Sequence, residues 1–298
     1  MSKLKGIVPP LLTPLTPTGE LDIDGLGRLI EHVISGGVHG VFILGTTGEG
    51  PALGRKLQKA MIENTCRLIA GRRPVLVGIS AAALDDSVWL ASIAKAIGAS
   101  AAVAAPPCYY PLGEPELFDY YESLVKCISP LPLYLYNMPS MTKISMKPST
   151  IIRLAQIPGI IGYKDSSGNM CDLHEVILAL QDREDFSIFV GPEELLGEAV
   201  FFGADGGVCG GANLTPQLFV AMYDAACQGD RERMRTLQKA IFSQRRLYQI
   251  GHHQSSLLKG LKCAVSMHHL CTDDLVAPFH HFEMPERQAV ERILSEIG

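Results

Sequence analysis

The sequence predicts an α/β protein, a closed (β/α)8 TIM barrel followed by a C-terminal helical extension. Short apolar segments, most of them bounded by Gly or Pro, recur eight times, and most of their starts are separated by roughly 25 to 35 residues, the length of one strand–helix unit. Segments with helical spacing of apolar residues lie between them. Eight strands that alternate with helices in this way favour a closed parallel barrel. The predicted strands are Gly6–Pro10, Gly40–Leu44, Pro74–Ile79, Ala101–Ala105, Leu133–Tyr136, Ile160–Tyr163, Ser187–Gly191 and Gly206–Cys209.

The helices are predicted from apolar spacing and from signals at their ends. Leu26, Leu29, Ile30 and Val33 repeat at helical spacing, and Glu114-Pro115-Glu116 opens a later helix with the acidic residues and early proline that helix N-termini prefer. No linker rich in Pro or Ser follows the eighth strand, so we expect a barrel over residues 1–225 and a packed extension over 226–298. The helices predicted after the eighth strand are Pro216–Cys227, Arg231–Tyr248, Ser255–Leu270 and Pro285–Ile297.

The main alternative fold is an open, doubly wound sheet. Such a sheet usually has fewer strands and often carries a glycine-rich dinucleotide turn after the first. Here the first strand continues into Leu12–Pro17, which is no GxGxxG motif. The barrel is therefore the favoured prediction.

Composition narrows the class of protein. The net charge is −5 and the pI is about 6.0, which gives no basic surface for nucleic acid. The beginning of the sequence has no apolar stretch typical of a signal peptide, and Lys95 interrupts the Ala-rich region Ala91–Pro107, which is unsuited to span a membrane. We expect a soluble, cytoplasmic protein.

The cysteines and histidines give no metal-site pattern. The eight cysteines form no CxxC pair, and we expect reduced, mostly buried thiols. Three adjacent pairs, His252-His253, His268-His269 and His280-His281, would diverge by about 100° on a helix and make poor chelates. No HExxH motif accompanies them. We expect solvated or interface histidines and no bound metal. The cysteines are Cys66, Cys108, Cys127, Cys171, Cys209, Cys227, Cys263 and Cys271.

Lys164 is the strongest candidate for a catalytic residue. It ends the apolar run that begins at Ile160, where its ammonium would lie at the rim of a core instead of in open water. Desolvation disfavours the charged form, and the free amine is a nucleophile for carbonyl carbons. Schiff-base chemistry on a keto substrate is the leading hypothesis. The alternative is an ordinary solvated lysine at the end of a strand.

Two further features fall at strand ends, where a barrel places its active site. The loop Gly45–Gly50 follows the second strand, and its backbone N–H groups, including that of Gly48, could bind a carboxylate together with the hydroxyls of Thr46 and Thr47. Alternatively, the glycines serve only a tight turn. Tyr136 ends the fifth strand, next to that of Lys164, and could transfer protons; otherwise it is a core tyrosine.

At this point the sequence resembles a known family. The motifs GTTGE, PxYYP, YNMPS and GYKDSSG are similar in order and spacing to those of the pyruvate-dependent class I aldolases, which include N-acetylneuraminate lyase and dihydrodipicolinate synthase. The resemblance extends from Gly6 to about Asn213 and continues more loosely through the C-terminal helices.

The resemblance implies roles for individual residues. Lys164 would form the Schiff base with pyruvate or another 2-oxo acid, Tyr136 would transfer protons, and Thr46 and Thr47 would hold the carboxylate and relay protons. Tyr109 would be lent to the site of a partner subunit. The resemblance also implies a homotetramer, usually a dimer of dimers, and chemistry that needs no metal or organic cofactor. The same mouth is expected to bind substrate through Ser166, Gly191, Glu193, Glu194 and Val208.

Departures from the family pattern guide the choice of branch. The synthase branch carries an arginine where this chain has Met141, and Lys143 stands where a glycine is usual. A missing bidentate pair would cost about 2 kcal/mol. Glu193 and Glu194 resemble the acidic pair that holds the polyol tail in the sialic acid lyase, although acidic residues also suit a helix N-terminus. Gly210 stands where that lyase has a serine; the glycines around it could instead mark a phosphate site or a close backbone approach.

The function predicted from the sequence is a lyase that reversibly cleaves a 2-keto-3-deoxy sugar acid, or a similar hydroxylated 2-oxo acid, to pyruvate and an aldehyde. Alternatives within the same chemistry are 4-hydroxy-tetrahydrodipicolinate synthesis and dehydration of a 2-keto-3-deoxy acid. A different class is a non-catalytic sensor of 2-oxo acids, which the departures at Met141, Lys143 and Gly210 would favour. A sensor alone would not need Lys164 and Tyr136 together.

Overall fold

The protein is an eight-stranded parallel barrel in a computed structural model that describes residues 3–253 and 255–297. Neighbouring strands pair in the order β1-β8-β7-β6-β5-β4-β3-β2, all in parallel. Each predicted strand is present, so the predicted fold class is confirmed. The strands are β1 (Gly6–Ile7), β2 (Val41–Ile43), β3 (Val75–Gly78), β4 (Ala101–Ala104), β5 (Leu133–Asn137), β6 (Ile160–Asp165), β7 (Ser187–Val190) and β8 (Gly206–Gly207).

The barrel closes between its first and second strands. β1 is shorter than the predicted Gly6–Pro10, because Pro9 and Pro10 have no N–H for the ladder. Their carbonyl groups can still pair with the next strand. The Pro9 carbonyl accepts a hydrogen bond from the Phe42 amide, and Pro10 forms a bridge to Phe42. At the other edge of β1, a Cβ on Gly206 would lie 1.9 Å from the carbonyl oxygen of Gly6, so this approach of backbones requires glycine.

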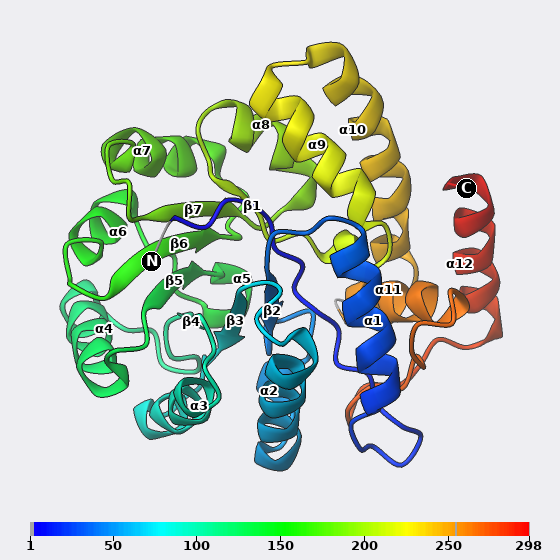
Figure 1. The fold of residues 1–298 in the computed structure, drawn as a ribbon, viewed down its shortest axis with the longest axis horizontal. Coiled ribbons are helices and arrows are strands. Elements are labelled where there is room, and N and C mark those ends of the chain that lie inside the picture. Colours follow the sequence, from blue (N-terminus) through cyan, green and yellow to red (C-terminus); the bar gives the residue numbers. More distant parts are fainter. Residues whose placement is uncertain (1–2, 254, 298) are drawn as a thin grey trace.

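Helices surround the sheet, and several begin where the sequence indicates (Figure 1). Asp22 and Asn169 cap two of them by accepting backbone N–H bonds, and Glu114 opens a third as predicted. The helices of the barrel are α1 (Ile23–Ser35), α2 (Arg55–Ile69), α3 (Leu84–Ala96), α4 (Glu114–Ile128), α5 (Pro139–Thr142), α6 (Pro148–Leu154), α7 (Met170–Leu180), α8 (Leu196–Phe201) and α9 (Pro216–Gln228), with 3-10 turns η1 (Gly50–Ala52), η2 (Glu193–Leu195) and η3 (Gly210–Asn213).

Apolar side chains form two separate cores. The larger core lies between the strands and the surrounding helices and includes Leu29, Tyr121 and Phe219. The smaller one fills the barrel interior, where Phe42 and Phe189 pack with residues from other strands. The interior is therefore a packed core with no open channel, and reactive side chains can lie only at its ends. The interior cluster consists of Val8, Phe42, Leu76, Ala101, Val103, Ala105, Tyr134, Tyr136, Phe189 and Val208.

The C-terminal extension packs on one side of the barrel. It consists of α10 (Arg231–Arg245), the 3-10 turn η4 (Arg246–Gln249), α11 (Ser256–Met267) and α12 (Met284–Ile297), and the last two lie together in orange and red in Figure 1. The proposed division at residue 225 falls within α9. Arg28 of α1 donates to the Leu270 carbonyl, and Thr272 donates to that of Leu15. Of the helices described, none combines the length and apolar character needed to cross a membrane.

The expectation of mostly buried cysteines is wrong. Cys209, Cys263 and Cys271 are buried and Cys66 is intermediate, but the other four are exposed. Three of these four lie on the outward faces of α4, α7 and α9. A shift of one residue along a helix decides whether a side chain faces the core or the solvent. All eight thiols are free. The exposed cysteines are Cys108, Cys127, Cys171 and Cys227.

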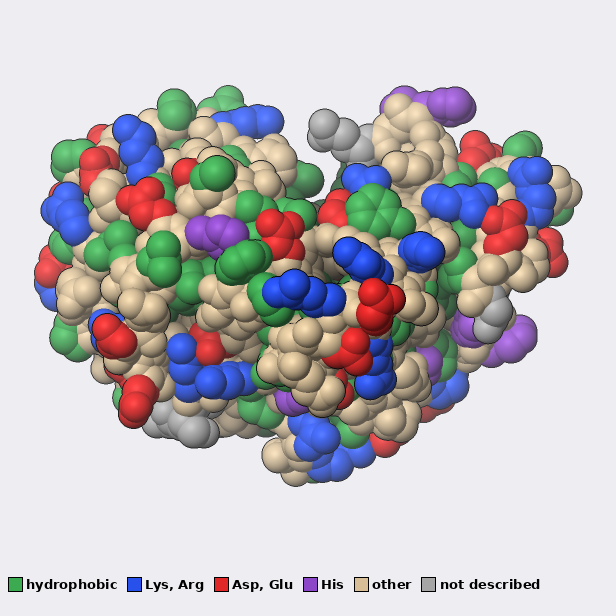
Figure 2. Space-filling view, turned by 90° about the horizontal axis from the view of Figure 1, so that it is seen from above, with side chains coloured by type: hydrophobic (Ala, Val, Ile, Leu, Met, Phe, Trp, Pro, Cys, Tyr) green, Lys and Arg blue, Asp and Glu red, His purple; other side chains and the backbone are tan. Residues whose placement is uncertain are grey.

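The histidine pairs lie outside regular helices, unlike the helical placement assumed from the sequence. His252-His253 precedes α11, His268-His269 follows it, and His280-His281 lies before α12. All six side chains are exposed. Figure 2 shows histidines at the surface on the side of the extension, and charges of both signs interspersed over the same face. Within residues 3–253 and 255–297, no three His, Cys, Asp or Glu side chains are grouped to hold a metal.

Candidate active site

Lys164 and Tyr136 lie side by side at the carboxyl ends of neighbouring strands. They are register partners in the β5–β6 ladder. The Lys164 ammonium nitrogen lies 3.9 Å from the centroid of the Tyr136 ring and 5.1 Å from that of Phe42. Lys164 is only 6% exposed. This excludes the solvated lysine that was the alternative interpretation.

Tyr136 is a buried phenol next to a cation. Burial alone would raise the pKa of Tyr136, but the Lys164 charge and hydrogen bonds from Thr46, Lys164 and Ser166 outweigh it, and the net pKa lies below the ordinary value. The Tyr136 hydroxyl and Thr46 Oγ1 are 3.4 Å apart. The second, fifth and sixth strands thus contribute to one polar cluster. A phenol of lowered pKa is a better proton donor and acceptor near neutral pH.

The loop after β2 holds its shape through unusual backbone conformations. Leu44 and Glu49, at its two ends, both have φ of +58°, a left-handed conformation that is costly for side chains other than glycine. A Cβ on Gly50 would lie 2.0 Å from the Leu44 carbonyl oxygen. Thr13 donates to the Gly48 carbonyl over 2.6 Å. The loop that carries Thr46 and Thr47 is therefore fixed by its surroundings.

A buried network that sequence reasoning missed supports the end of β6. The Asp165 carboxylate accepts hydrogen bonds from Tyr163 (2.8 Å), Asn137 (3.0 Å) and Ser167 (2.8 Å). Burial and the Asp165 charge raise the pKa of the Tyr163 phenol. The sequence signal for this network was the polar residues at the ends of the two strands, Tyr136-Asn137 and Lys164-Asp165-Ser166-Ser167. This network holds the backbone on both sides of Lys164.

Three of the predicted substrate-binding residues lie at adjacent strand ends. Gly191 donates its N–H to the Asp165 carbonyl over 2.6 Å, and a Cβ on it would lie 2.0 Å from Ser166 Oγ. Val208 follows β8 and belongs to the interior cluster with Tyr136. Ser166 and Gly191 are thus in direct contact, and Val208 lies beneath the same mouth.

Glu193 is a buried carboxyl group that accepts one well-formed hydrogen bond. It is 4% exposed, and its Oε2 accepts the Gly211 N–H over 2.7 Å. Its Oε1 makes no hydrogen bond of ordinary geometry with any described residue. Burial raises the pKa of Glu193 to about 7, although the Gly211 N–H and the Tyr248 hydroxyl oppose the shift. Such a group exchanges a proton near neutral pH.

Tyr248 of η4 is a further residue that sequence reasoning missed. Its hydroxyl is buried, and burial and the Glu193 carboxylate raise its pKa well above the ordinary value. A Cβ on Gly210 would lie 3.3 Å from this hydroxyl and 3.8 Å from Thr47 Oγ1. The extension therefore brings a hydroxyl next to the position where the sialic acid lyase pattern has a serine. Its distance in sequence from the other site residues concealed it.

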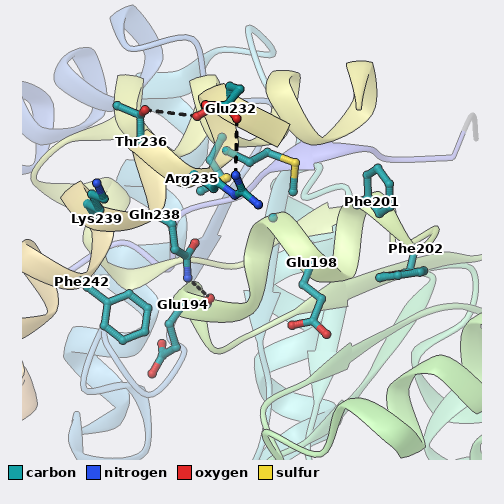
Figure 3. A pocket seen from close by; sticks show the side chains of 13 residues that line it. Glu194, Glu198, Phe201, Phe202, Glu232, Arg235, Thr236, Gln238, Lys239 and Phe242 are labelled. Atoms are coloured by element: carbon teal, nitrogen blue, oxygen red, sulfur yellow. Dashed lines mark hydrogen bonds and ion pairs between the residues drawn. The ribbon is translucent and has the colours of Figure 1, made fainter. Parts of the chain in front are cut away.

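Glu194 points away from Glu193. Its Oε1 accepts from Arg245 Nε over 2.7 Å, and its carbonyl accepts from Gln238 of α10. It lines an outer groove of about 710 Å³ between α8 and α10 that also includes Phe201 and Phe242 (Figure 3). The structure thus places the predicted acidic pair on two sides of η2, with Glu193 turned inward.

The remaining predicted residues are exposed. Tyr109 is 82% exposed, with φ of +93°, and its ring stands edge-on to that of Tyr110. Met141 on α5 is 51% exposed. Lys143 follows α5 with φ of +63°, the conformation that glycine favours, and its Nζ donates to the Ser140 carbonyl. It therefore caps its own helix.

The fold and the site together define a class of protein: a (β/α)8 barrel that buries a lysine beside a tyrosine at the carboxyl ends of its strands. The sequence model of the dihydrodipicolinate synthetase family matches residues 3–297. The chain belongs to this family, whose members are pyruvate-dependent lyases, and it is an enzyme of that kind.

Individual relatives carry different names. A probable 2-dehydro-3-deoxy-D-pentonate aldolase of Escherichia coli is 33% identical over 261 residues, which cover 87% of this chain and 86% of that protein. The structure of dihydrodipicolinate synthase from Bacteroides thetaiotaomicron superposes with a TM-score of 0.96 at 50% identity and 99% coverage of both chains. The E. coli prophage protein YagE, solved with pyruvate, gives a TM-score of 0.92 at 26% identity and 98% coverage of both chains.

Proposed function

We propose that Lys164 forms a Schiff base with pyruvate and that the enzyme reversibly cleaves a 2-keto-3-deoxy sugar acid, or a similar hydroxylated 2-oxo acid, to pyruvate and an aldehyde. The observation that carries this proposal is the Lys164 nitrogen 3.9 Å from the ring centroid of Tyr136, whose hydroxyl is 3.4 Å from Thr46 Oγ1. A nucleophile, a proton carrier and a relay hydroxyl are all within reach of one substrate carbon.

The proposed reaction uses each of these groups in turn. The Lys164 ammonium first gives up its proton to solvent, the free amine attacks the keto carbon, and loss of water gives an iminium. Tyr136 takes the proton from the substrate hydroxyl while the C–C bond breaks, and the bonding electrons enter the iminium to give an enamine. The aldehyde leaves, the enamine carbon is protonated, and water releases pyruvate from Lys164.

The rest of the site indicates what the substrate looks like. The loop with Thr46, Thr47 and Gly48 is suited to the carboxylate next to the keto group. On and after α5, Met141 offers no charge and the Lys143 amine donates to the Ser140 carbonyl. Neither of these two residues offers a free cation to a second carboxylate, whereas Glu193 can accept a bond from a hydroxyl. We therefore favour a hydroxylated, uncharged distal chain.

Synthesis of 4-hydroxy-tetrahydrodipicolinate is a second candidate, favoured by the 50% identity to dihydrodipicolinate synthase from Bacteroides thetaiotaomicron. An assay panel separates the two. It consists of 2-keto-3-deoxygluconate, its pentose analogues, N-acetylneuraminate, 4-hydroxy-2-oxoglutarate and aspartate semialdehyde, each tested for release or consumption of pyruvate. Release of pyruvate from a sugar acid supports the aldolase. Consumption of pyruvate with aspartate semialdehyde, and no turnover of the other compounds, would replace the aldolase with the synthase. Loss of water from a sugar acid without release of pyruvate would indicate a dehydratase.

Borohydride trapping tests the shared first step. The protein is incubated with pyruvate, reduced, and mapped by mass spectrometry. We expect one adduct on Lys164, and Lys164→Ala should abolish turnover while the fold is retained. An adduct elsewhere, or full activity of the variant, contradicts the proposal. A thermal shift with pyruvate but no product from any substrate would favour the 2-oxo acid sensor.

We also propose a homotetramer in the cytoplasm, in which the exposed Tyr109 enters the site of a partner subunit. The exposure of the Tyr109 and Tyr110 rings supports a contact with a partner subunit. The eight free thiols support a reducing compartment. Sedimentation measures the assembly. Activity regained by mixing inactive Tyr109→Phe and Lys164→Ala chains would support a shared site, and a fully active monomer would contradict it.

A further inference from the structure

Glu49 and Lys262 form a fully buried ion pair behind the loop Gly45–Gly50, which is called the carboxylate-binding loop below. Lys262 Nζ donates to Glu49 Oε1 over 2.7 Å, and both side chains have no exposed surface. The other carboxylate oxygen, Oε2, accepts the Val276 N–H over 2.8 Å. Glu49 ends the loop after β2, whereas Lys262 lies on α11 and Val276 follows it. Two parts of the extension therefore hold one side chain of the loop.

Stability alone does not explain this pair. Removing two charges from water is costly, and buried ion pairs are often no more stabilising than apolar side chains of the same volume. A buried pair fixes geometry, however, because each partner is held by the cost of leaving the other unpaired. The location of the pair therefore indicates what it fixes.

The backbone shows how the pair acts on the loop. Glu49 has φ of +58°, a conformation that an unanchored glutamate would leave. Its amide donates to the Thr46 carbonyl over 3.0 Å, and the next amide, of Gly50, donates to the Gly45 carbonyl over 3.1 Å. These two bonds close the turn that presents Thr46 and Thr47. If the Glu49 side chain lost its anchor, the turn could relax and both hydroxyls would move.

We propose that Lys262, through Glu49, is a positioning residue for the carboxylate-binding loop, so that the C-terminal extension completes the active site. The proposal rests on the function proposed above, in which Thr46 and Thr47 hold the carboxylate of pyruvate. Lys262 itself does not touch the substrate. Its contribution is the orientation of the loop that does.

The experiment compares three variants of the full chain. Lys262→Met removes the lysine half of the anchor and leaves the Glu49 carboxylate buried without its cation. Glu49→Gln/Lys262→Met removes the ion pair without leaving a charge, and in both variants the Val276 N–H can still bond residue 49. The control is Lys3→Met, which also takes a lysine from a buried carboxylate, to which Lys5 Nζ remains at 3.9 Å. Lys3 Nζ lies 3.0 Å from Asp205, which is at the amino end of β8, on the opposite face of the barrel.

Two readouts separate positioning from general stability. The first is the pyruvate concentration that gives half of the maximal borohydride adduct on Lys164, and the second is amide hydrogen exchange of residues 44–50. For both Lys262 variants we expect the half-saturating concentration to rise about 10- to 100-fold, with an adduct still formed at saturation, and faster exchange of the loop. Lys3→Met should lower the melting temperature and leave both readouts unchanged.

The outcomes are decisive in each case. Wild-type half-saturation and exchange in either Lys262 variant would overturn the proposal. So would loss of folding in both variants while Lys3→Met folds, because the pair would then support the whole structure. If the unmodified protein traps no pyruvate, the proposed function fails, and the exchange of residues 44–50 still tests the positioning role.

Discussion

Two buried glutamates at the same end of the barrel have opposite surroundings. Glu49, after β2, has a lysine on one oxygen and a backbone N–H on the other. Glu193, after β7, has a backbone N–H on one oxygen, while the other makes no ordinary hydrogen bond within the described part of the chain. Burial raises the pKa of Glu193 to about 7. The contrast teaches that a carboxylate with both oxygens satisfied is an anchor, whereas one half-satisfied can receive a proton or a ligand.

The largest effect should come from removing the anchor charge. Glu49→Gln leaves Lys262 as a buried, unpaired ammonium, and we expect a loss of about 3–5 kcal/mol in the free energy of unfolding. Glu193→Gln, measured by urea unfolding at pH 8, should lose nothing or gain, because it removes a carboxylate that burial disfavours. Equal losses in the two variants would contradict the comparison.

The pH dependence of stability should separate the same two sites. Glu193 has a folded-state pKa of about 7 against 4.5 in the unfolded chain, so the folded state binds its proton more tightly. Stability from this group is complete below pH 4.5 and is lost as pH rises through about 7. Relative to Glu193→Gln, the unmodified protein should lose about 3 kcal/mol across this window. A constant difference between the two unfolding curves from pH 4.5 to 8 would show that Glu193 does not titrate there.

The next effect concerns the substrate. If Glu193 Oε1 accepts a hydroxyl of the distal chain, Glu193→Ala should lower kcat/KM for a sugar acid about 10-fold, roughly 1.4 kcal/mol, because one hydrogen bond to a charged acceptor is lost. The half-saturating pyruvate concentration in trapping should not change. The matched control is Glu194→Ala, since Glu194 pairs with Arg245 on the outer side of η2. A larger loss for the Glu194 variant would assign the distal contact to that residue.

The sequence predicted those parts of the site that depend on neighbouring strands. Lys164 and Tyr136 lie near the carboxyl ends of consecutive strands of a parallel barrel, so their proximity follows from strand order. Their direct register pairing depends in addition on a shift between Leu133 and Tyr134 in the β5–β6 ladder. The eight strands were predictable for the same reason, since each is a short apolar run between turn signals.

The other contacts of the site depend on packing between residues far apart in the sequence. The pairing of Glu49 with Lys262 spans 213 residues and depends on how the extension docks, which no local pattern encodes. The different directions of Glu193 and Glu194 depend on the 3-10 turn η2, where a shift of one residue reverses what a side chain faces. Tyr248 was hidden in the same way, because its η4 turn reaches the mouth only through the packing of the extension.

The smallest effect tests whether a left-handed backbone needs a side-chain anchor. Lys143 has φ of +63°, close to the +58° of Glu49, but its Nζ contacts only the nearby Ser140 carbonyl at the surface. Because this contact offsets little of the conformational cost, Lys143→Gly should raise the free energy of unfolding by roughly 0.5–1 kcal/mol. Glu49→Gly should lower it despite the same relief of backbone strain, because the buried Lys262 then has no partner. Urea unfolding of both variants at one pH measures the two signs. Stabilisation by both substitutions would mean that the Glu49 side chain holds nothing in place, and destabilisation by both would mean that Lys143 is anchored more firmly than its one surface hydrogen bond indicates.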